Sequence, residues 1–289
     1  MERQAADLAP ALYLVATPIG AARDITLRAL DVLGSADILA AEDTRVLRRL
    51  LEIHGVPRAG RHILPYHDHN GPAQRPVLLE HLAAGRSVAY TSDAGTPLVA
   101  DPGYRLVQEV IAAGHAVVPV PGASAVLPAL TLSGLPSDRF LFAGFPPGSG
   151  AARLRFLAEF KDVPATLIFF ESGKRVSGLL KDCVKVFGGE RAAAMARELT
   201  KRHEEVQRGL LSELADQLDA RVLKGEIVVL VDRPRRQADE EDVQAALADA
   251  LATMSVRDAA RSVADDLGLN RRTVYQVALS MDADTSDPD

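Results

Sequence analysis

Short apolar runs alternate with segments of helical spacing through the first half of the chain. The apolar runs occupy residues 11–17, 37–43, 61–67, 87–92 and 115–120. Helical spacing occupies residues 26–36, 44–55, 72–85 and 104–114. Strands that alternate with helices pair mainly in parallel, and strands covered on both faces have nearly continuous apolar sequences. The sequence therefore predicts an α/β fold whose first sheet is mostly parallel.

The pattern changes near residue 134. Apolar strands are predicted at residues 139–145, 165–172 and 226–232, and helices at 174–188 and 211–225. Residues 191–200 and 204–209 flank a charged turn, which is typical of a hairpin, so this second sheet is predicted to be mixed. We expect an N-terminal α/β domain at residues 1–133 and a second α/β domain at 134–232.

A polar linker at residues 233–242 precedes a helical extension at residues 243–280. Ser255 and Asn270 stand where N-caps are expected, and the order helix, turn, helix resembles a helix-turn-helix. The acidic, apolar-poor segment 281–289 is predicted to be a disordered tail.

Composition narrows the class of protein. The 289 residues carry a net charge of −6 and include one cysteine, Cys183, which excludes an intramolecular disulfide and a cysteine-rich zinc site. No apolar run approaches the ~18 residues that span a bilayer, and the N-terminus has no signal-peptide pattern. We therefore expect a cytoplasmic protein with no membrane partner.

Three loops rich in small residues follow predicted strands. They are ATPIGAARD (16–24), SDAGTPLVADPG (92–103) and PGASAVLPAL (121–130). Because ligands of open α/β sheets bind at the carboxyl ends of strands, we expect these loops to converge on a ligand site. Phosphate-binding glycine motifs are absent from the sequence, which argues against a P-loop or dinucleotide enzyme. We expect Asp93 to contact the ligand and Asp101 to shape the turn.

Other polar clusters leave alternatives open. The HDHN segment (67–70) has no third metal ligand at a convincing spacing, so no metal site is expected. The segments ESGKR (171–175) and RELTKRHEE (197–205) combine acids and bases after predicted strands. They are either surface ion pairs or a rim that meets a polyanion near a reacting hydroxyl.

Nine motifs occur in one order over residues 11–280. They are LYLVATPIG, AEDTR, YHDHN, SDAGTPLVADPG, PGASA, GLPSDRF, FFES, RELTKRHEE and KGEIVVLV. Together they resemble the ribosomal RNA small-subunit methyltransferase I family, within the tetrapyrrole methylase (class III) superfamily. The resemblance implies two α/β domains with S-adenosylmethionine (AdoMet) in the cleft between them, and a homodimer. It also implies methylation of a cytidine ribose 2′-hydroxyl in the decoding region of 16S ribosomal RNA, with the small ribosomal subunit as partner.

The resemblance also implies roles for individual residues. The AdoMet pocket would be lined by Ile19, Asp93, Ala94, Gly95, Thr96, Ser124 and Ala125. A ribose hydroxyl is a weak nucleophile that benefits from a base, and the candidate catalytic residues are Glu171, Glu198 and Lys201. Contacts to RNA are expected from Arg45, Lys174, Arg175, Arg197, Arg271 and Arg272.

The chain departs from the family pattern at four positions, where it has Ala21, Ala123, Gly173 and Lys174. The last two replace the proline and histidine of a common ESPHR motif, so no catalytic histidine is expected at position 174. Two alternatives to RNA methylation stand beside it: methylation of a small tetrapyrrole, and a helix-turn-helix regulator that binds DNA.

Overall fold

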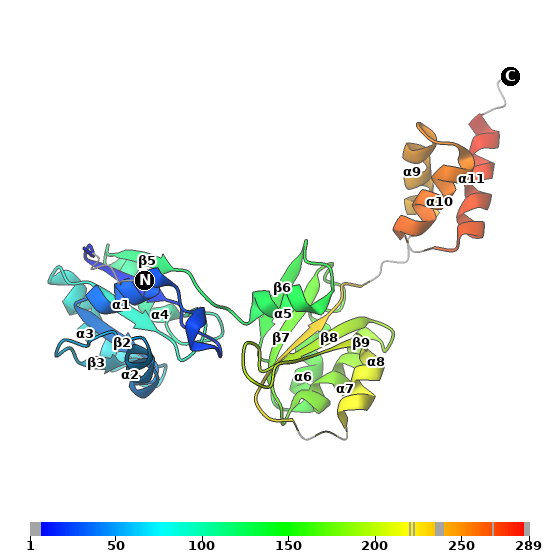
Figure 1. Cartoon of the computed structure of the whole chain (residues 1–289). Coiled ribbons are helices and arrows are strands. Elements are labelled where there is room, and N and C mark those ends of the chain that lie inside the picture. Colours follow the sequence, from blue (N-terminus) through cyan, green and yellow to red (C-terminus); the bar gives the residue numbers. More distant parts are fainter. Residues whose placement is uncertain (1–6, 220, 222, 235–239, 268, 286–289) are drawn as a thin grey trace. The chain divides into compact units, whose positions relative to one another are not determined.

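The computed structural model describes residues 7–219, 221, 223–234, 240–267 and 269–285. These residues belong to two compact units, residues 1–234 and 235–289. Two five-stranded sheets with their helices make up the described part of the first unit, and three helices make up that of the second (Figure 1).

The first sheet has the strand order β3-β2-β4-β1-β5, and its neighbouring strands are all parallel. Its strands are β1 (Ala11–Val15), β2 (Ile38–Ala41), β3 (Ile63–Pro65), β4 (Val88–Thr91) and β5 (Ala116–Val120). The connecting helices are α1 (Leu27–Ser35), α2 (Thr44–Ile53), α3 (Gly71–Ala83) and α4 (Tyr104–Ala112), with a 3₁₀ turn at Ala22–Asp24. The predicted parallel sheet is confirmed.

Both faces of this sheet are buried because successive side chains of a strand point to opposite faces. Tyr13 of β1 packs in a cluster with residues of α1 and α2. Its neighbour Leu12 packs with residues of α3 and α4 on the other face. This two-sided burial explains why the strands read as continuous apolar runs.

The second sheet has the order β6-β7-β10-β8-β9 and is mixed, as expected. Only β6 and β7 pair in parallel, and the other neighbours are antiparallel. The strands are β6 (Phe140–Gly144), β7 (Thr166–Ser172), β8 (Ala192–Arg197), β9 (Glu205–Leu210) and β10 (Glu226–Val231). Helices α6 (Gly150–Ala158), α7 (Val176–Phe187) and α8 (Leu211–Asp219) contribute to the core on one face.

Helix α5 (Val126–Ser133) covers the opposite face of the second sheet (Figure 1). Its apolar residues Val126, Ala129 and Leu130 pack against β7, β8 and β10. The expected boundary at residues 133/134 placed this segment in the first domain. The structure instead packs α5 on the second sheet, because that is where its apolar face is buried.

The second unit is a three-helix bundle formed by α9 (Glu240–Leu251), α10 (Val256–Leu267) and α11 (Arg271–Thr285). Ser255 and Asn270 accept hydrogen bonds from backbone N–H groups of α10 and α11, as their expected capping role requires. Helix α11 extends into the segment predicted to be disordered, because Met281 packs against the bundle core. Residues 286–289 of that segment lie outside the described residues.

No helix within the described parts of the chain is long and apolar enough to cross a membrane.

Candidate functional site

Three loops at the carboxyl ends of β1, β4 and β5 are joined by hydrogen bonds. The backbone N–H of Thr17 donates to the Gly95 carbonyl at 2.8 Å, and the N–H of Gly95 donates to the Thr17 carbonyl at 2.9 Å. The hydroxyl of Thr96 donates to the Ala123 carbonyl at 3.0 Å. Because β4, β1 and β5 are neighbours in the sheet, their loops meet as the sequence predicted.

A cavity of about 300 Å³ opens between these loops and the second sheet. The first sheet and its loops contribute Ile19, Glu42, Asp93, Ala94, Gly95, Thr96, Val99, Ala100, Asp101, Ser124 and Ala125. The second sheet and its loops contribute Phe145, Phe170, Glu171, Glu226, Ile227 and Val228. All seven residues expected to contact AdoMet therefore lie in one wall, and their contacts with a cofactor stay a prediction.

Carboxylates dominate the charge of the cavity. Its lining includes Glu42, Asp93, Asp101, Glu171 and Glu226, and none of its described lining residues is lysine or arginine. Burial raises the pKa of Glu42, and the adjacent Asp93 carboxylate raises it further. Burial also raises the pKa of Asp101. Bringing negative charges together in this way is costly unless a cation compensates them, so the cavity is suited to a positively charged ligand.

Both aspartates of the loop after β4 lie in the cavity wall, whereas the sequence predicted a ligand contact for Asp93 alone. Asp101 lies in the cavity wall, although the sequence suggested only a turn. Asp93 also lies in the wall, and its carboxylate accepts a hydrogen bond from the backbone N–H of Asp43 at 2.9 Å. Asp93 therefore ties the loop after β4 to the start of α2 as well as facing the cavity.

The loop after β4 is held in a backbone conformation that its side chains disfavour. Leu98 and Ala100 have φ of 73° and 62°, in the left-handed region that L-residues rarely adopt. The Tyr90 hydroxyl, beneath this loop, donates to the Pro102 carbonyl at 3.0 Å. Strained backbone of this kind persists only where surrounding contacts enforce it, and it concentrates at ligand sites.

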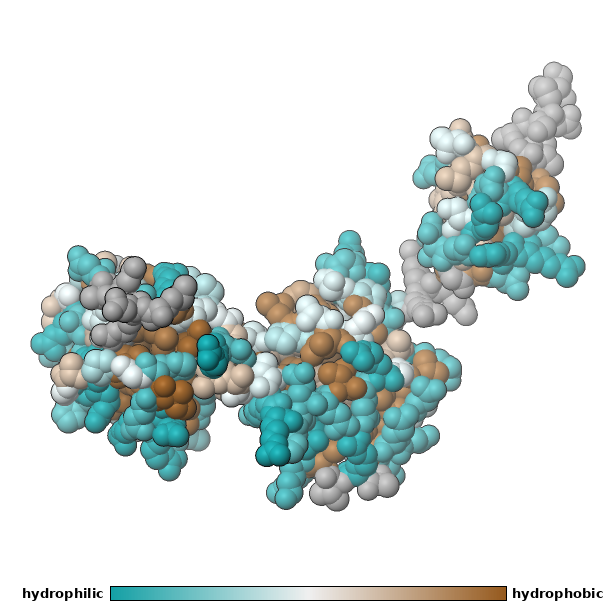
Figure 2. Space-filling model, in the orientation of Figure 1, coloured by the Kyte–Doolittle hydropathy of each residue, from teal (hydrophilic) through white to brown (hydrophobic). Residues whose placement is uncertain are grey.

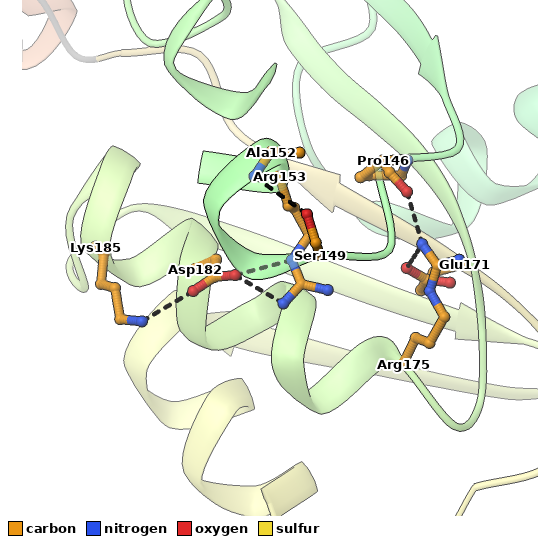
Figure 3. A network of polar contacts seen from close by, with 8 residues as sticks. All are labelled: Pro146, Ser149, Ala152, Arg153, Glu171, Arg175, Asp182 and Lys185. Carbon is orange, nitrogen blue, oxygen red and sulfur yellow. Dashed lines mark hydrogen bonds and ion pairs between the residues drawn. The ribbon is translucent and has the colours of Figure 1, made fainter. Parts of the chain in front are cut away.

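Glu171 is the candidate catalytic residue that reaches the cavity. It lies near the end of β7 and is buried, and its Oε2 pairs with the Arg175 guanidinium at 3.0 Å. Its Oε1 accepts the Ser172 N–H at 2.8 Å. Figure 3 shows that Arg175 also donates to the Pro146 carbonyl, at 2.6 Å. These contacts fix the carboxylate and leave Arg175, an expected RNA contact, occupied within the protein.

Glu198 and Lys201 do not line the cavity. The Lys201 ammonium bridges two carboxylates, Glu198 at 2.9 Å and the cavity residue Glu226 at 2.8 Å. Hydrogen bonds from Lys201 lower the pKa of Glu198, which keeps it ionised. The geometry therefore assigns these two residues to holding Glu226, one step removed from the cavity.

The remaining expected RNA contacts in the first unit differ in accessibility. Lys174 is exposed. Arg197 donates to the Lys224 carbonyl at 2.8 Å and pairs with Glu205 at 3.2 Å. Arg45 is exposed beside Asp43 and lines a second groove of about 520 Å³ together with Arg49. This groove shares Asp93 with the cavity.

The structure accounts for departures from the family motifs. The N–H of Gly173 donates to the Gly225 carbonyl at 3.1 Å, and a Cβ at position 173 would lie 2.4 Å from the Leu223 carbonyl oxygen. Only glycine fits there, so a proline would not. Ala21 and Ala123 take part through backbone groups, the Ala21 N–H donating to the Thr200 hydroxyl at 3.1 Å. These contacts use backbone groups and not the alanine side chains.

The parallel sheet, the mixed second sheet and the cavity between their loops define a class of methyltransferases. The family model described as "Tetrapyrrole (Corrin/Porphyrin) Methylases" matches residues 11–215, and "RsmI C-terminal HTH domain" matches residues 237–282. Solved structures share the fold. The methyltransferase CobJ is 19% identical with a TM-score of 0.60, covering 78% of this chain and 95% of that one. Uroporphyrin-III C-methyl transferase from Thermus thermophilus, complexed with S-adenyl homocysteine, is 22% identical with a TM-score of 0.53, covering 76% and 96%.

Curated relatives identify the family more closely. The ribosomal RNA small subunit methyltransferase I of Mesorhizobium japonicum is 52% identical over 287 residues, which cover 99% of this chain and 96% of the relative. The protein of the same name from Vibrio cholerae is 43% identical and covers 94% and 95%. The chain belongs to the ribosomal RNA small subunit methyltransferase I family. Membership confirms the predicted methyltransferase class and its cofactor, S-adenosylmethionine.

Proposed function

We propose that this protein methylates the ribose 2′-hydroxyl of a cytidine in the decoding region of 16S ribosomal RNA, with the small ribosomal subunit as substrate. The carboxylate-lined cavity beneath the Thr17–Gly95 bridge carries the proposal. The names of the full-length relatives supply the substrate class.

The residues of the cavity fit AdoMet. Its sulfonium and ammonium groups are cations, and Glu42, Asp93 and Asp101 offer the negative charge that would stabilise them. Apolar side chains such as Phe170 and Val228 offer a surface for an adenine ring. Ile19, Ala94, Gly95, Thr96, Ser124 and Ala125 would complete the pocket with small side chains and backbone. When bound, AdoMet supplies a methyl group that its sulfonium activates.

The protein's part in the reaction is to place the hydroxyl and remove its proton. Glu171 is the carboxylate of the second sheet that is both buried and in the cavity wall, so it is our first choice for the base. Its ion pair with Arg175 holds the carboxylate in a fixed orientation. Glu198 and Lys201, the other candidates, would act by positioning Glu226.

RNA would be held by the cations around the cavity. Arg45 in the adjoining groove and the exposed Lys174 would meet phosphates of the RNA. Arg175 and Arg197 would contribute positive potential while they remain bonded within the protein. Arg271 and Arg272 of the second unit would add further phosphate contacts.

The same proposal includes a homodimer in the cytoplasm. Leu127 and Phe140 are exposed apolar side chains of the first unit that a second copy would cover. Hydrophobic areas on the visible face of this unit appear in Figure 2. Analytical ultracentrifugation, which would give twice the monomer mass, tests this part.

Mass mapping of ribose methylation tests the central proposal. Small subunits purified from cells that lack this protein are incubated with the protein and AdoMet, and the ribosomal RNA is then digested and mapped. We expect one cytidine in the decoding region to gain a methyl group. Equal methylation in cells with and without the protein, or transfer to a precorrin instead of RNA, would overturn it.

A further inference from the structure

All the arginine side chains of residues 240–285 line one groove. This segment contains four arginines and no lysine. The groove, of about 610 Å³, is lined by Arg257, Ala260, Arg261, Arg271, Arg272 and Tyr275. Every arginine of the segment therefore lies in a single wall.

Helix geometry produces this arrangement. Arg257 and Arg261 are four residues apart on α10, so they lie on the same face of that helix. Arg271 and Tyr275 have the same spacing on α11, beside Arg272. The buried residues Ala260 and Val263 of α10 pack in the bundle core, which fixes the adjoining face toward solvent.

The rest of the segment is acidic, so the positive groove is a local feature. Residues 240–285 include nine aspartates and glutamates against the four arginines. The visible face of this unit is mostly hydrophilic (Figure 2). Four cations that line one groove of the acidic segment 240–285 offer a defined site for an anion, and the acids of that segment disfavour anions elsewhere on it.

The arginines are available to a ligand. Arg261 pairs with Asp258 at 2.8 Å and Arg271 with Asp265 at 3.0 Å, both in exposed pairs that contribute little to stability. Arg257 and Arg272 make no guanidinium hydrogen bond or ion pair with another described residue. Tyr275, with 39% of its surface exposed, places an aromatic ring among these cations.

We propose that this groove binds an unpaired stretch of RNA, with phosphates on the arginines and a base stacked on Tyr275. An arginine groove with an aromatic ring matches how proteins hold single strands, where stacking on exposed rings adds to phosphate contacts. The bases of a duplex are already stacked on one another and cannot lie on Tyr275, which favours unpaired RNA over double-stranded DNA. The inference rests on the proposed function for the source of the RNA, and it assigns the second unit a binding site of its own.

Fluorescence anisotropy of the full-length protein with a labelled single-stranded RNA of about 12 nucleotides tests the groove. We expect R257Q/R272Q to weaken binding about tenfold and to lower the slope of log Kd against log salt by about one to two. Tyr275→Leu should weaken binding about fivefold or more without changing that slope, and Tyr275→Phe should bind like the wild type.

A matched control removes two exposed arginines of the first unit, in R58Q/R155Q, with the same change in net charge. Its RNA affinity should stay within about twofold of the wild type. The groove is excluded if R257Q/R272Q binds like this control while circular dichroism shows both folded, or if duplex DNA binds more tightly than the RNA.

Methylation kinetics on small subunits separate this inference from the proposed function. If both hold, R257Q/R272Q raises KM and leaves kcat near the wild-type value. If the wild type binds RNA through the groove but transfers no methyl group, only the proposed function fails. If R257Q/R272Q transfers methyl groups with the wild-type KM and binds RNA with the wild-type affinity, only the proposed RNA site in the groove is wrong.

Discussion

Thr17 and Gly95 exchange both of their backbone hydrogen bonds and so join the loops after β1 and β4. Gly95 makes this bridge with a φ of +81°, a left-handed conformation that glycine adopts without the penalty an L-residue would incur. The bridge forms the edge of the cavity at which the expected AdoMet residues meet.

Gly95→Ala should weaken AdoMet binding because alanine disfavours this φ by roughly 1–2 kcal/mol. A shift of the Thr17–Gly95 bridge would displace Ile19 and Thr96, which line the cavity in the two loops that the bridge joins. Isothermal titration calorimetry measures the loss, which we expect to be about tenfold or more. Gly114→Ala is the matched control, since Gly114 has a φ of +78° and open space around it. Equal cofactor affinity in both variants would contradict a special role for the bridge.

AdoMet affinity should depend on pH through Glu42 and Asp101. Both have raised pKa values in the free protein, and a bound cation favours their ionised forms. Binding therefore releases protons, and affinity falls as pH falls through these raised pKa values. Calorimetry in buffers of different ionisation enthalpy measures the proton release.

Asp101→Asn should flatten this pH dependence and weaken binding near neutrality, because one compensating charge is removed. Glu159→Gln changes an exposed carboxylate outside the cavity lining and should leave the profile unchanged. An Asp101→Asn profile that matches the wild type would assign the pH dependence to other groups.

Glu171→Gln should lower kcat for methyl transfer by about 10²–10⁴-fold while the Kd for AdoMet changes little, because the amide cannot accept the hydroxyl proton. The hydrogen bond from the Ser172 N–H can remain with the amide oxygen. Glu198→Gln provides the comparison: it should lower kcat less, since Glu198 acts through Lys201 and Glu226. The reverse order of effects would move the base to Glu198.

Arg153 and Asp182 form a buried ion pair at 2.7 Å, with side chains 9% and 7% exposed, and Lys185 pairs with the same carboxylate (Figure 3). Arg153→Ala should destabilise the protein by about 3–5 kcal/mol, because it removes the buried partner of Asp182 and leaves that carboxylate with only the more exposed Lys185. Replacing both partners, in R153M/D182L, should recover most of this loss. Chemical denaturation measures the free energies of unfolding, and Asp219→Asn, in an exposed pair with Lys181, should have little effect.

The same pair predicts an acid limit to stability. Burial alone would raise the pKa of Asp182, but hydrogen bonds from Lys185 and Arg153 lower it below its usual value. A lowered folded-state pKa contributes stability at neutral pH that is lost as pH falls through that pKa. The difference in unfolding free energy between the wild type and R153M/D182L should therefore shrink or reverse in acid.

The sequence predicted those features of the fold and site that depend on the local order of apolar and small residues. The apolar runs of β1 and β4 are visible because both faces of the first sheet are buried, and the three small-residue loops follow from strand order. The pattern of residues 121–130 predicts a loop where the structure has the start of helix α5, because the apolar residues of α5 face a sheet formed much later in the chain. Glu226 was missed for a related reason: it reaches the cavity only through the pairing of β10 with β7 and β8. Such non-local pairing leaves no signal in the residues themselves.

Leu98 and Ala100 hold conformations that cost energy, and nothing in their own sequence favours those conformations. Contacts of their loop with Thr17 and Ala123, and the Tyr90 hydroxyl bound to Pro102, help to keep them there. Mild denaturant should therefore release this loop before either sheet melts, so cofactor binding would disappear while the circular dichroism of the helices is still native. Loss of cofactor binding would therefore detect partial unfolding that circular dichroism does not detect.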